Sequence, residues 1–234
     1  MRVSRLISAS NWRYTIGEVV LIVVGVSIAL AASSWYENRQ LRGDEYAALQ
    51  QLQVTLGEDL DRITIAYDTI IRVNQRIESF VEHIEEGQLE QGEITTGINS
   101  IGRFVTLHLR YGPYETLKAR GIGLISDRSL RVKITSLYED EIPSLVENSQ
   151  IDRRLSRDRV LPFVLEWFWL DASGDWVPKE SPAARWHNDL VTLGRYRAGT
   201  LTGYYLPSFE RTIELMRELL AEIDAELRRS NPNE

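Results

Sequence analysis

The N-terminal part of the chain contains a long run of apolar residues. The stretch YTIGEVVLIVVGVSIALAASSWYENR covers residues 14–39, and Glu18 is the only charged residue between Ile16 and Trp35. About 20 helical residues at 1.5 Å each match a hydrocarbon core roughly 30 Å thick. Tryptophan and tyrosine flank both ends, as expected for side chains at the level of the lipid headgroups. The pattern predicts a transmembrane helix over residues 14–36.

A signal peptide is the alternative interpretation of this run. Ala29 and Ala31 form an A-x-A pattern behind about a dozen apolar residues, which is typical of a cleavage site. Against cleavage, the region before the apolar run is long and includes Glu18, and the helical pattern continues through Leu41 into the next segment. We therefore favour an uncleaved anchor.

Positive charges near the span predict its orientation. Arg2, Arg5 and Arg13 precede the span with no acidic residue before Glu18, whereas the arginines on the far side are mixed with acids. Lys and Arg are retained on the cytoplasmic side of a membrane. We expect a cytoplasmic tail over residues 1–13 and an exported C-terminal part.

Four residues of the span are candidates for contact with another transmembrane helix. Gly25, Ala29 and Ser33 recur at every fourth position, a spacing of small residues that lets helix backbones approach closely. Glu18 is the fourth, because it would meet a polar group on a partner helix; alternatively, its carboxylate reaches the headgroups or stays protonated. We expect a protein partner or self-association through this face.

Beyond the span, apolar residues recur at helical spacing at both ends of the chain. In the first stretch they fall at every seventh position: Leu49, Leu56, Ile63, Ile70, Ile77 and Ile84. In the last stretch they fall at alternating spacings of four and three: Phe209, Ile213, Met216, Leu220, Ile223 and Leu227. The spacing predicts a helix over residues 44–86, ended by Gly87, and a last helix with Pro207 in its first turn. Two long apolar stripes are expected to pack together. We therefore predict an all-α fold in which residues 37–229 form an extramembrane helical bundle closed by its long first and last helices, with a disordered tail over 230–234.

The middle of the chain predicts shorter helices. We expect one over residues 95–109, one opened by Pro113 and closed by Gly121, and a longer one that Ser126 or Asp127 caps. The longer helix should kink at Pro143 and continue toward Arg157. No stretch alternates clearly enough to predict a strand, and Tyr204 with Tyr205 is interpreted as a helix end.

Composition limits the chemistry. The chain carries 27 basic and 34 acidic residues, and 24 and 33 of these lie beyond residue 36, so that part has a net charge of −9. An acidic surface argues against nucleic acid or anionic lipid as the main partner. The chain has no cysteine, which excludes disulfides, thiolate metal sites and a cysteine nucleophile. We predict no cofactor.

Aromatic residues crowd around the turn DASGD. They include four tryptophans within about two dozen residues, which we take as a candidate partner or ligand surface: Trp167, Trp169, Trp176 and Trp186. Such rings can stack on a ligand, contact a partner or rest on a membrane surface, because each offers a large apolar area. The competing interpretation is a small satellite core under a long loop.

Polar candidates for catalysis or metal binding are weak. His83 lies among Glu82, Glu85 and Glu86, but only Glu86 shares its helix face, so a solvated acidic helix end is the favoured interpretation. No nucleophile elbow, S-x-x-K pair or phosphate loop is present. The sequence therefore does not predict an enzyme.

Two stretches resemble a known family. YTIGEVVLIVVGVSIAL running into SSWYENRQLR, and later YETLKARGIGLISDRSLRVKITSLYED, are similar to a family of uncharacterised bacterial single-pass inner-membrane proteins classified as a domain of unknown function. The similarity covers the N-terminal quarter and residues 114–140. It implies a single-pass topology and a helical domain, and it implies no activity, cofactor or site residue.

Two classes of function remain for such a protein. The first is an accessory or scaffold protein that presents a periplasmic helical bundle to a protein partner. The second is a periplasmic ligand-sensing bundle that signals through a partner membrane protein. Only about 13 residues are expected in the cytoplasm before a span of this length. They leave no room for an output domain, so the first class is favoured.

Overall fold

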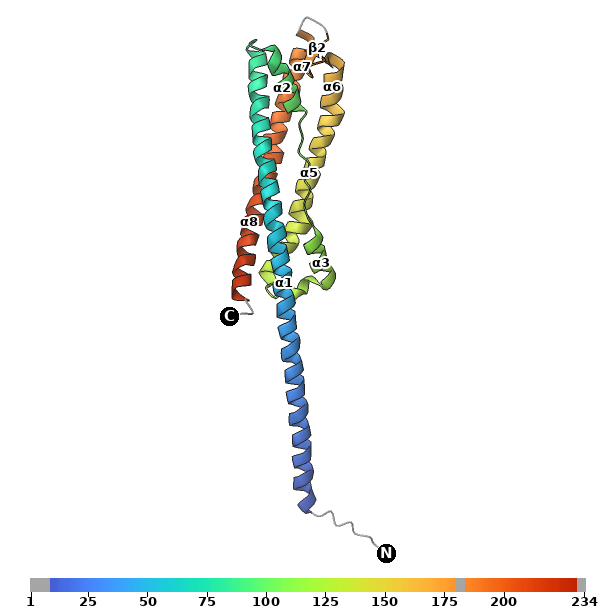
Figure 1. The fold of residues 1–234 in the computed structure, drawn as a ribbon, viewed down its shortest axis with the longest axis vertical. Helices are drawn as coiled ribbons and strands as arrows, with labels where there is room; N and C mark the ends of the chain where they lie inside the picture. The colour runs from blue at the N-terminus through green and yellow to red at the C-terminus, as the bar shows by residue number, and fades with distance from the viewer. Residues whose placement is uncertain (1–8, 180–183, 231–234) are drawn as a thin grey trace.

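The computed structural model describes residues 9–179 and 184–230. The expectations for Arg2, Arg5 and the last four residues of the C-terminal tail therefore lie outside the described residues. The chain is predominantly helical, and its N-terminal helix extends far beyond the other elements (Figure 1).

Helix α1 (Ala9–Glu85) forms the axis of the molecule. Its apolar part begins at Ile16, is long enough to cross a membrane, and is not covered by any other described part of the chain. The predicted stop at Gly87 is confirmed: this glycine has a φ of 70°, and the amides of Gly87 and Gln88 donate to the carbonyls of Ile84 and His83 at 3.2 and 2.9 Å. This is the Schellman arrangement, in which a left-handed glycine satisfies the last carbonyls of a helix.

The remaining helices pack alongside the C-terminal half of α1, and we call residues 44–229 the helical body (Figure 1). Its helices are α2 (Gln91–Ile101), α3 (Gly112–Arg120), α4 (Arg128–Ser136), α5 (Ile142–Leu155), α6 (Leu161–Trp167), α7 (Ala184–Thr200) and α8 (Leu206–Arg229), with a 3₁₀ turn, η1 (Ile122–Leu124), after α3. The expected boundaries of α3 are confirmed, with Gly121 at a φ of 99°. Asp127 caps α4, because its Oδ1 accepts a hydrogen bond from the Leu130 amide at 3.0 Å.

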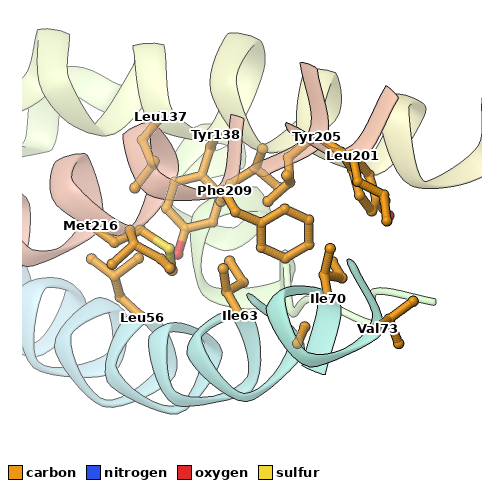
Figure 2. Packing of buried hydrophobic residues seen from close by; sticks show 14 of the residues in the cluster. Leu56, Ile63, Ile70, Val73, Leu137, Tyr138, Leu201, Tyr205, Phe209 and Met216 are labelled. Atoms are coloured by element: carbon orange, nitrogen blue, oxygen red, sulfur yellow. The ribbon is translucent and has the colours of Figure 1, made fainter. Parts of the chain in front are cut away.

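The core of the helical body follows the predicted seams. All six residues of the seven-residue repeat on α1, from Leu49 to Ile84, are buried, and so are the predicted α8 residues except Leu220, which is half-buried. Figure 2 shows Ile63 and Ile70 of α1 facing Phe209 of α8, with Tyr138 and Tyr205 completing the layer. Burial of these side chains supplies the main favourable free energy of folding.

Two helices approach α1 closely at glycines. A Cβ added to Gly97 of α2 would lie 2.2 Å from the Phe80 ring of α1, and one added to Gly194 of α7 would lie 2.5 Å from Val81. Neither distance is compatible with normal packing, because well-packed interiors have no space for an added methyl group. These two glycines therefore set the distance of α2 and α7 from α1.

Prolines lie within continuous helical runs. Widened π-helical turns occur at η2 (Leu137–Glu141), η3 (Ser156–Val160) and η4 (Leu201–Tyr205), each placed two residues before a proline: Pro143, Pro162 and Pro207. In each case the residue before the proline donates its amide to the carbonyl five positions back. The wider turn moves away the carbonyl that the proline ring would otherwise contact. The chain is consequently helical from Arg128 to Trp167 and from Ala184 to Arg229, and Tyr204 and Tyr205 lie within a helix and not at its end.

The predicted helix over residues 95–109 is wrong in its second half. Helix α2 ends at Ile101, and residues 103–110 form an extended connection to α3 that runs along the helical body (Figure 1). Gly102 forms the C-cap. In the segment RFVTLHLR the odd positions Val105, Leu107 and Leu109 are half-buried and the even positions are exposed. This alternation is typical of a strand, and it overlaps with the helical spacing that misled the sequence analysis.

The expectation of no strand is also wrong. Strands β1 (Phe168–Leu170) and β2 (Trp176–Pro178) pair in antiparallel fashion around the DASGD turn. Asp171 organises the turn, because its Oδ1 accepts the amides of Ser173 and Asp175 at 2.8 and 2.9 Å, and Gly174 adopts a φ of 87°. Strands of three residues are too short to show alternation in the sequence.

Candidate functional site

The small residues predicted to contact another helix lie on the uncovered part of α1. Glu18, Gly25, Ala29 and Ser33 are all exposed, and a Cβ at Gly25 would meet nothing within 4 Å. Residues seven and four apart share one face of a helix, so Glu18 lies on the same stripe as Gly25 and Ala29. The described chain leaves this stripe free, and its packing against a partner helix stays a prediction.

The four tryptophans divide into core and surface residues. Trp186 is 3% exposed, and its ring meets that of Phe168 edge to face at 5.0 Å. Trp176 is half-buried; its amide donates to Thr95 Oγ1 at 2.9 Å and its indole to Asn99 Oδ1 at 3.1 Å. Trp186 and Trp176 thus hold α7 and the hairpin in place, which matches the interpretation as a satellite core.

Trp169 is the exposed member of the group. Its side chain is 52% exposed, and three large apolar residues near it in the sequence are also exposed: Leu161, Leu165 and Leu170. We call these four residues the distal apolar patch. Leu161 and Leu165 are four residues apart and so share a face of α6. Lone exposed apolar residues are ordinary, whereas several together mark contact surfaces.

The distal apolar patch lies far from the apolar span. From Trp35 to Glu85, α1 advances about 75 Å at 1.5 Å per residue. The hairpin lies at this distal end (Figure 1), where the Trp176 amide donates to Thr95 Oγ1 of α2. With the span in a membrane, the exposed ring of Trp169 is therefore much too distant to rest on the same membrane surface.

A buried ion pair crosses the helical body. Arg197 of α7 and Asp152 of α5 are 1% and 4% exposed and form a two-pronged contact, in which Nη2 lies 2.9 Å from Oδ2. The same Nη2 donates to the carbonyl of Arg103 at 2.8 Å. Burial lowers the pKa of Arg197 to about 10, which still leaves the guanidinium charged at neutral pH. The pair fixes α5, α7 and the extended segment relative to each other.

The sequence analysis missed this pair, although a signal for it exists. Asp152 occupies a core-facing position in the α5 spacing Leu145, Ser149, Asp152, and Arg197 does so in the α7 spacing Leu190, Arg197, Leu201. A charged residue at an apolar-periodic position predicts a buried partner of opposite charge, because an unpaired buried charge is very costly.

A cavity of about 680 Å³ lies between η3 and η4, lined by Asn148, Ile151, Asp152, Arg154, Leu155, Asp158, Arg159, Tyr196, Thr200, Tyr204 and Tyr205. Tyr204 and Tyr196 are 77% and 60% exposed at its rim, whereas Tyr205 is buried. Burial raises the pKa of Tyr205 to about 12, so its hydroxyl stays protonated at neutral pH. The size is in the range of small-molecule sites.

Two buried acidic residues of α1 accept hydrogen bonds from the segments that precede and follow α3. Glu45 Oε1 accepts the amide and the hydroxyl of Ser126 at 2.6 and 2.8 Å, and Asp59 Oδ2 accepts the Arg110 amide at 2.8 Å. His83 Nδ1 lies 2.8 Å from Glu93 Oε1 of α2, so its carboxylate neighbour comes from another helix. Among the residues that the structure describes, no group of three His, Asp or Glu side chains is arranged to hold a metal ion.

Comparison with protein-family models, characterised proteins and solved structures finds no match to this chain. The family resemblance of the two quoted stretches therefore stays a prediction.

Proposed function

We propose that the protein is a membrane-anchored accessory or scaffold protein without enzymatic activity. In this proposal α1 is an uncleaved single-pass anchor in a bacterial inner membrane, with the N-terminus in the cytoplasm. The helical body is a periplasmic bundle, closed by α1 and α8, that is presented to a protein partner. Contact through Glu18 and the small residues of α1 would bring in a membrane partner or a second copy.

The distal apolar patch is the observation that supports partner binding. Its four large apolar side chains are between 46% and 54% exposed and lie on α6 and β1, at the far end of the body from the span. Large exposed aromatic and aliphatic side chains that are close together in the chain are candidates for the anchors of a protein contact. A continuous helix below them suits the role of a spacer that holds this surface about 75 Å from the lipid.

Co-purification from membranes tests the partner-binding role. The tagged full chain is solubilised in mild detergent, and Trp169→Glu is compared with Glu166→Gln, a change at an exposed neighbouring position of α6. We expect one or more proteins to co-purify with the wild type and with Glu166→Gln, and to be lost with Trp169→Glu. Identical sets of proteins for all three chains would contradict the proposal.

Localisation has its own test. A reporter that is active only outside the cytoplasm, fused after Glu234, should be active, and the purified protein should keep its full-length mass. Activity of a cytoplasm-only reporter at the same position would reverse the orientation. A mature chain that starts near Ala32 would show that the span is a cleaved signal.

A ligand-sensing role is the second candidate, and the cavity between η3 and η4 favours it. Asp152 and Asp158 in its wall already pair with Arg197 and Arg157, so the charges of Arg154 and Arg159 are left for a ligand. π-helical turns occur often at functional sites. Saturable binding of an aromatic carboxylate such as 1-naphthoate, lost in Arg159→Ala, would support this role; the absence of binding by that probe class would count against it.

A further inference from the structure

The extended segment, residues 103–110, has two backbone edges that differ in their environment. In an extended chain the N–H and C=O groups of successive residues point to opposite sides. The carbonyl of Arg103 accepts a hydrogen bond from Arg197 at 2.8 Å, and the carbonyl of Val105 accepts one from Ser149 Oγ at 3.4 Å. We call the side to which the backbone groups of residues 103, 105, 107 and 109 point the odd-numbered edge, and the opposite side the even-numbered edge. The odd-numbered edge is therefore attached to α5 and α7.

The even-numbered edge faces α1. The Arg110 amide donates to Asp59 Oδ2 of α1 at 2.8 Å, which fixes the direction of this edge. The N–H and C=O groups of Phe104, Thr106 and His108 lie on the same edge, and within the described parts of the chain they make no hydrogen bond. An edge of unpaired donors and acceptors is a template for a further strand.

Space for a strand exists beside this edge. A groove of about 760 Å³ runs between the extended segment and α1, lined on the α1 side by Arg62, Ile65, Ala66 and Thr69. Ile65 is 65% exposed there, although Ile63, Ile70, Ile77 and Ile84 of the same helix are buried. From Phe104 to His108 the unpaired edge extends about 13 Å at 3.3 Å per residue. It can therefore pair with a strand of about five residues.

The groove is basic, although the chain as a whole is acidic. Its lining contains Arg62, Arg103, His108 and Arg110 and no carboxylate. Glu58 and Asp59 pair with Arg62 and Arg110 and so compensate one end. The other end, at Arg103, has no acidic side chain within ion-pair distance among the described residues. A ligand strand with an acidic residue at this end would be favoured.

We propose that the groove binds an extended, acidic segment of a partner protein, which adds as a strand to the even-numbered edge of residues 103–110. The inference rests on the proposed accessory function and names the chemistry of the partner. Main-chain hydrogen bonds supply the affinity, an apolar side chain of the segment covers Ile65, and a carboxylate pairs with Arg103. A second copy of this chain is a poor occupant, because its own residues 103–110 include Arg103 and Arg110 and no acidic residue, so this edge cannot supply the carboxylate.

Binding of designed peptides to the full chain in detergent tests this proposal. The probe is a fluorescent eight-residue peptide of alternating valine and threonine with two glutamates at one end, and its matched control carries two lysines instead. We expect the acidic peptide to bind at least tenfold more tightly and its affinity to fall with salt. Two further versions of the acidic peptide are N-methylated at alternate amides, one version on each edge. Only the version that blocks the pairing edge should lose binding.

Variants of the protein test the same contact from the other side. Thr106→Pro removes one N–H from the even-numbered edge, and Thr106→Ala is its control because it shortens the same side chain and keeps the N–H. The amide of Thr106 has no partner among the described residues and its side chain is exposed, so both variants should melt like the wild type. We expect Thr106→Pro to lose binding at least tenfold, Thr106→Ala to keep it, and Arg103→Glu to prefer the lysine peptide.

Hydrogen exchange gives a readout that does not depend on folding of any variant. The amides of Phe104, Thr106 and His108 should exchange rapidly in the free wild type and become protected with the acidic peptide. Equal binding of the acidic and basic peptides, indifference to N-methylation, or self-association through residues 103–110 would each overturn the proposal. If these peptides fail while Trp169→Glu still abolishes co-purification, the strand-addition site is wrong and the accessory function stands; the reverse pattern rejects the distal apolar patch alone.

Discussion

Replacement of Arg197 by methionine should show how much the helical body depends on its buried ion pair. Methionine keeps most of the side-chain volume, so the change removes the charge and the hydrogen bonds with little loss of packing. Asp152 is 4% exposed and would keep a buried carboxylate without its cation, and the Arg103 carbonyl would lose its donor. Breaking a buried pair by removal of one partner is much more costly than replacing both partners.

The structure sets the size of the expected effect. Removal of one partner from a buried pair costs about 3 to 5 kcal/mol of the free energy of unfolding. This is a large share of the roughly 5 to 15 kcal/mol that stabilise a typical domain. For a body of this size, each kcal/mol corresponds to about 2 to 4 °C in melting temperature, so we expect a fall of roughly 6 to 20 °C.

Thermal melts of the full chain in detergent, followed by circular dichroism, measure this effect. Arg195→Met is the matched control: it lies two residues earlier on α7, its side chain is 66% exposed, and it pairs with Glu85 at 2.5 Å on the surface. Such exposed pairs contribute at most about 1 kcal/mol. The double variant Arg197→Met with Asp152→Leu should recover most of the loss. If Arg197→Met melts like Arg195→Met, or if the double variant is no better than the single one, the argument from burial fails.

Three further predictions concern packing and pH. Ile63→Ala should cost about 2 to 5 kcal/mol in chemical or thermal unfolding because Ile63 is 0% exposed, whereas Ile65→Ala, two residues along α1 and 65% exposed, should change stability by about 0.5 kcal/mol or less. Gly97→Ala should lower the free energy of unfolding by about 1 to 3 kcal/mol, because its methyl group overlaps the Phe80 ring. The control, Gly92→Ala in the same helix, meets no atom within 4 Å and should be neutral or slightly stabilising. Equal melting temperatures for these two variants would show that α2 does not pack on α1 as described. Hydrogen bonds from Lys118 and Tyr114 hold the pKa of Glu139 below its ordinary value of 4.5, so this contact stabilises the fold above that pH and is lost as the pH falls through the lowered pKa. Glu139→Gln should therefore weaken the dependence of the free energy of unfolding on pH in the acidic range. An unchanged dependence in this variant would refute the assignment.

The long elements could be predicted from the sequence because their signals repeat many times. Six apolar residues at intervals of seven identify the buried face of α1 over almost ten helical turns, and accidental agreement over that length is rare. Gly87 and Gly121 were recognised as helix ends for a specific reason, namely the left-handed backbone that glycine tolerates. Each of these predictions depends on a local rule that the rest of the fold does not override.

The short elements could not be predicted because tertiary contacts decide them. Residues 103–110 are rich in residues that suit a strand, but Ile98, Ile101 and Val105 also fit a helical face. The contacts of Arg197, Ser149 and Asp59 with the backbone fix the extended form. The three-residue strands are held by the turn around Asp171 and by the hydrogen bond from Trp176 of β2 to Thr95 of α2. In the aromatic group, only the structure separates buried Trp186 from exposed Trp169, because ring size alone does not tell which face is covered.

Pro207 shows how a correct local rule can give a wrong boundary, whereas the expected continuation of the helix beyond Pro143 is confirmed. A proline removes an amide donor and its ring meets the carbonyl four residues earlier, which usually ends a helix. Here Pro143, Pro162 and Pro207 each follow a π turn that shifts the pairing from four residues to five, so the helix continues through them. The extra residue also rotates all later positions by about 100° relative to an unbroken helix. The apolar positions that face the core must therefore be identified separately before and after each π turn. With this shift, α7 and α8 form one continuous helical run beside α1 although the spacing of their apolar residues changes at η4.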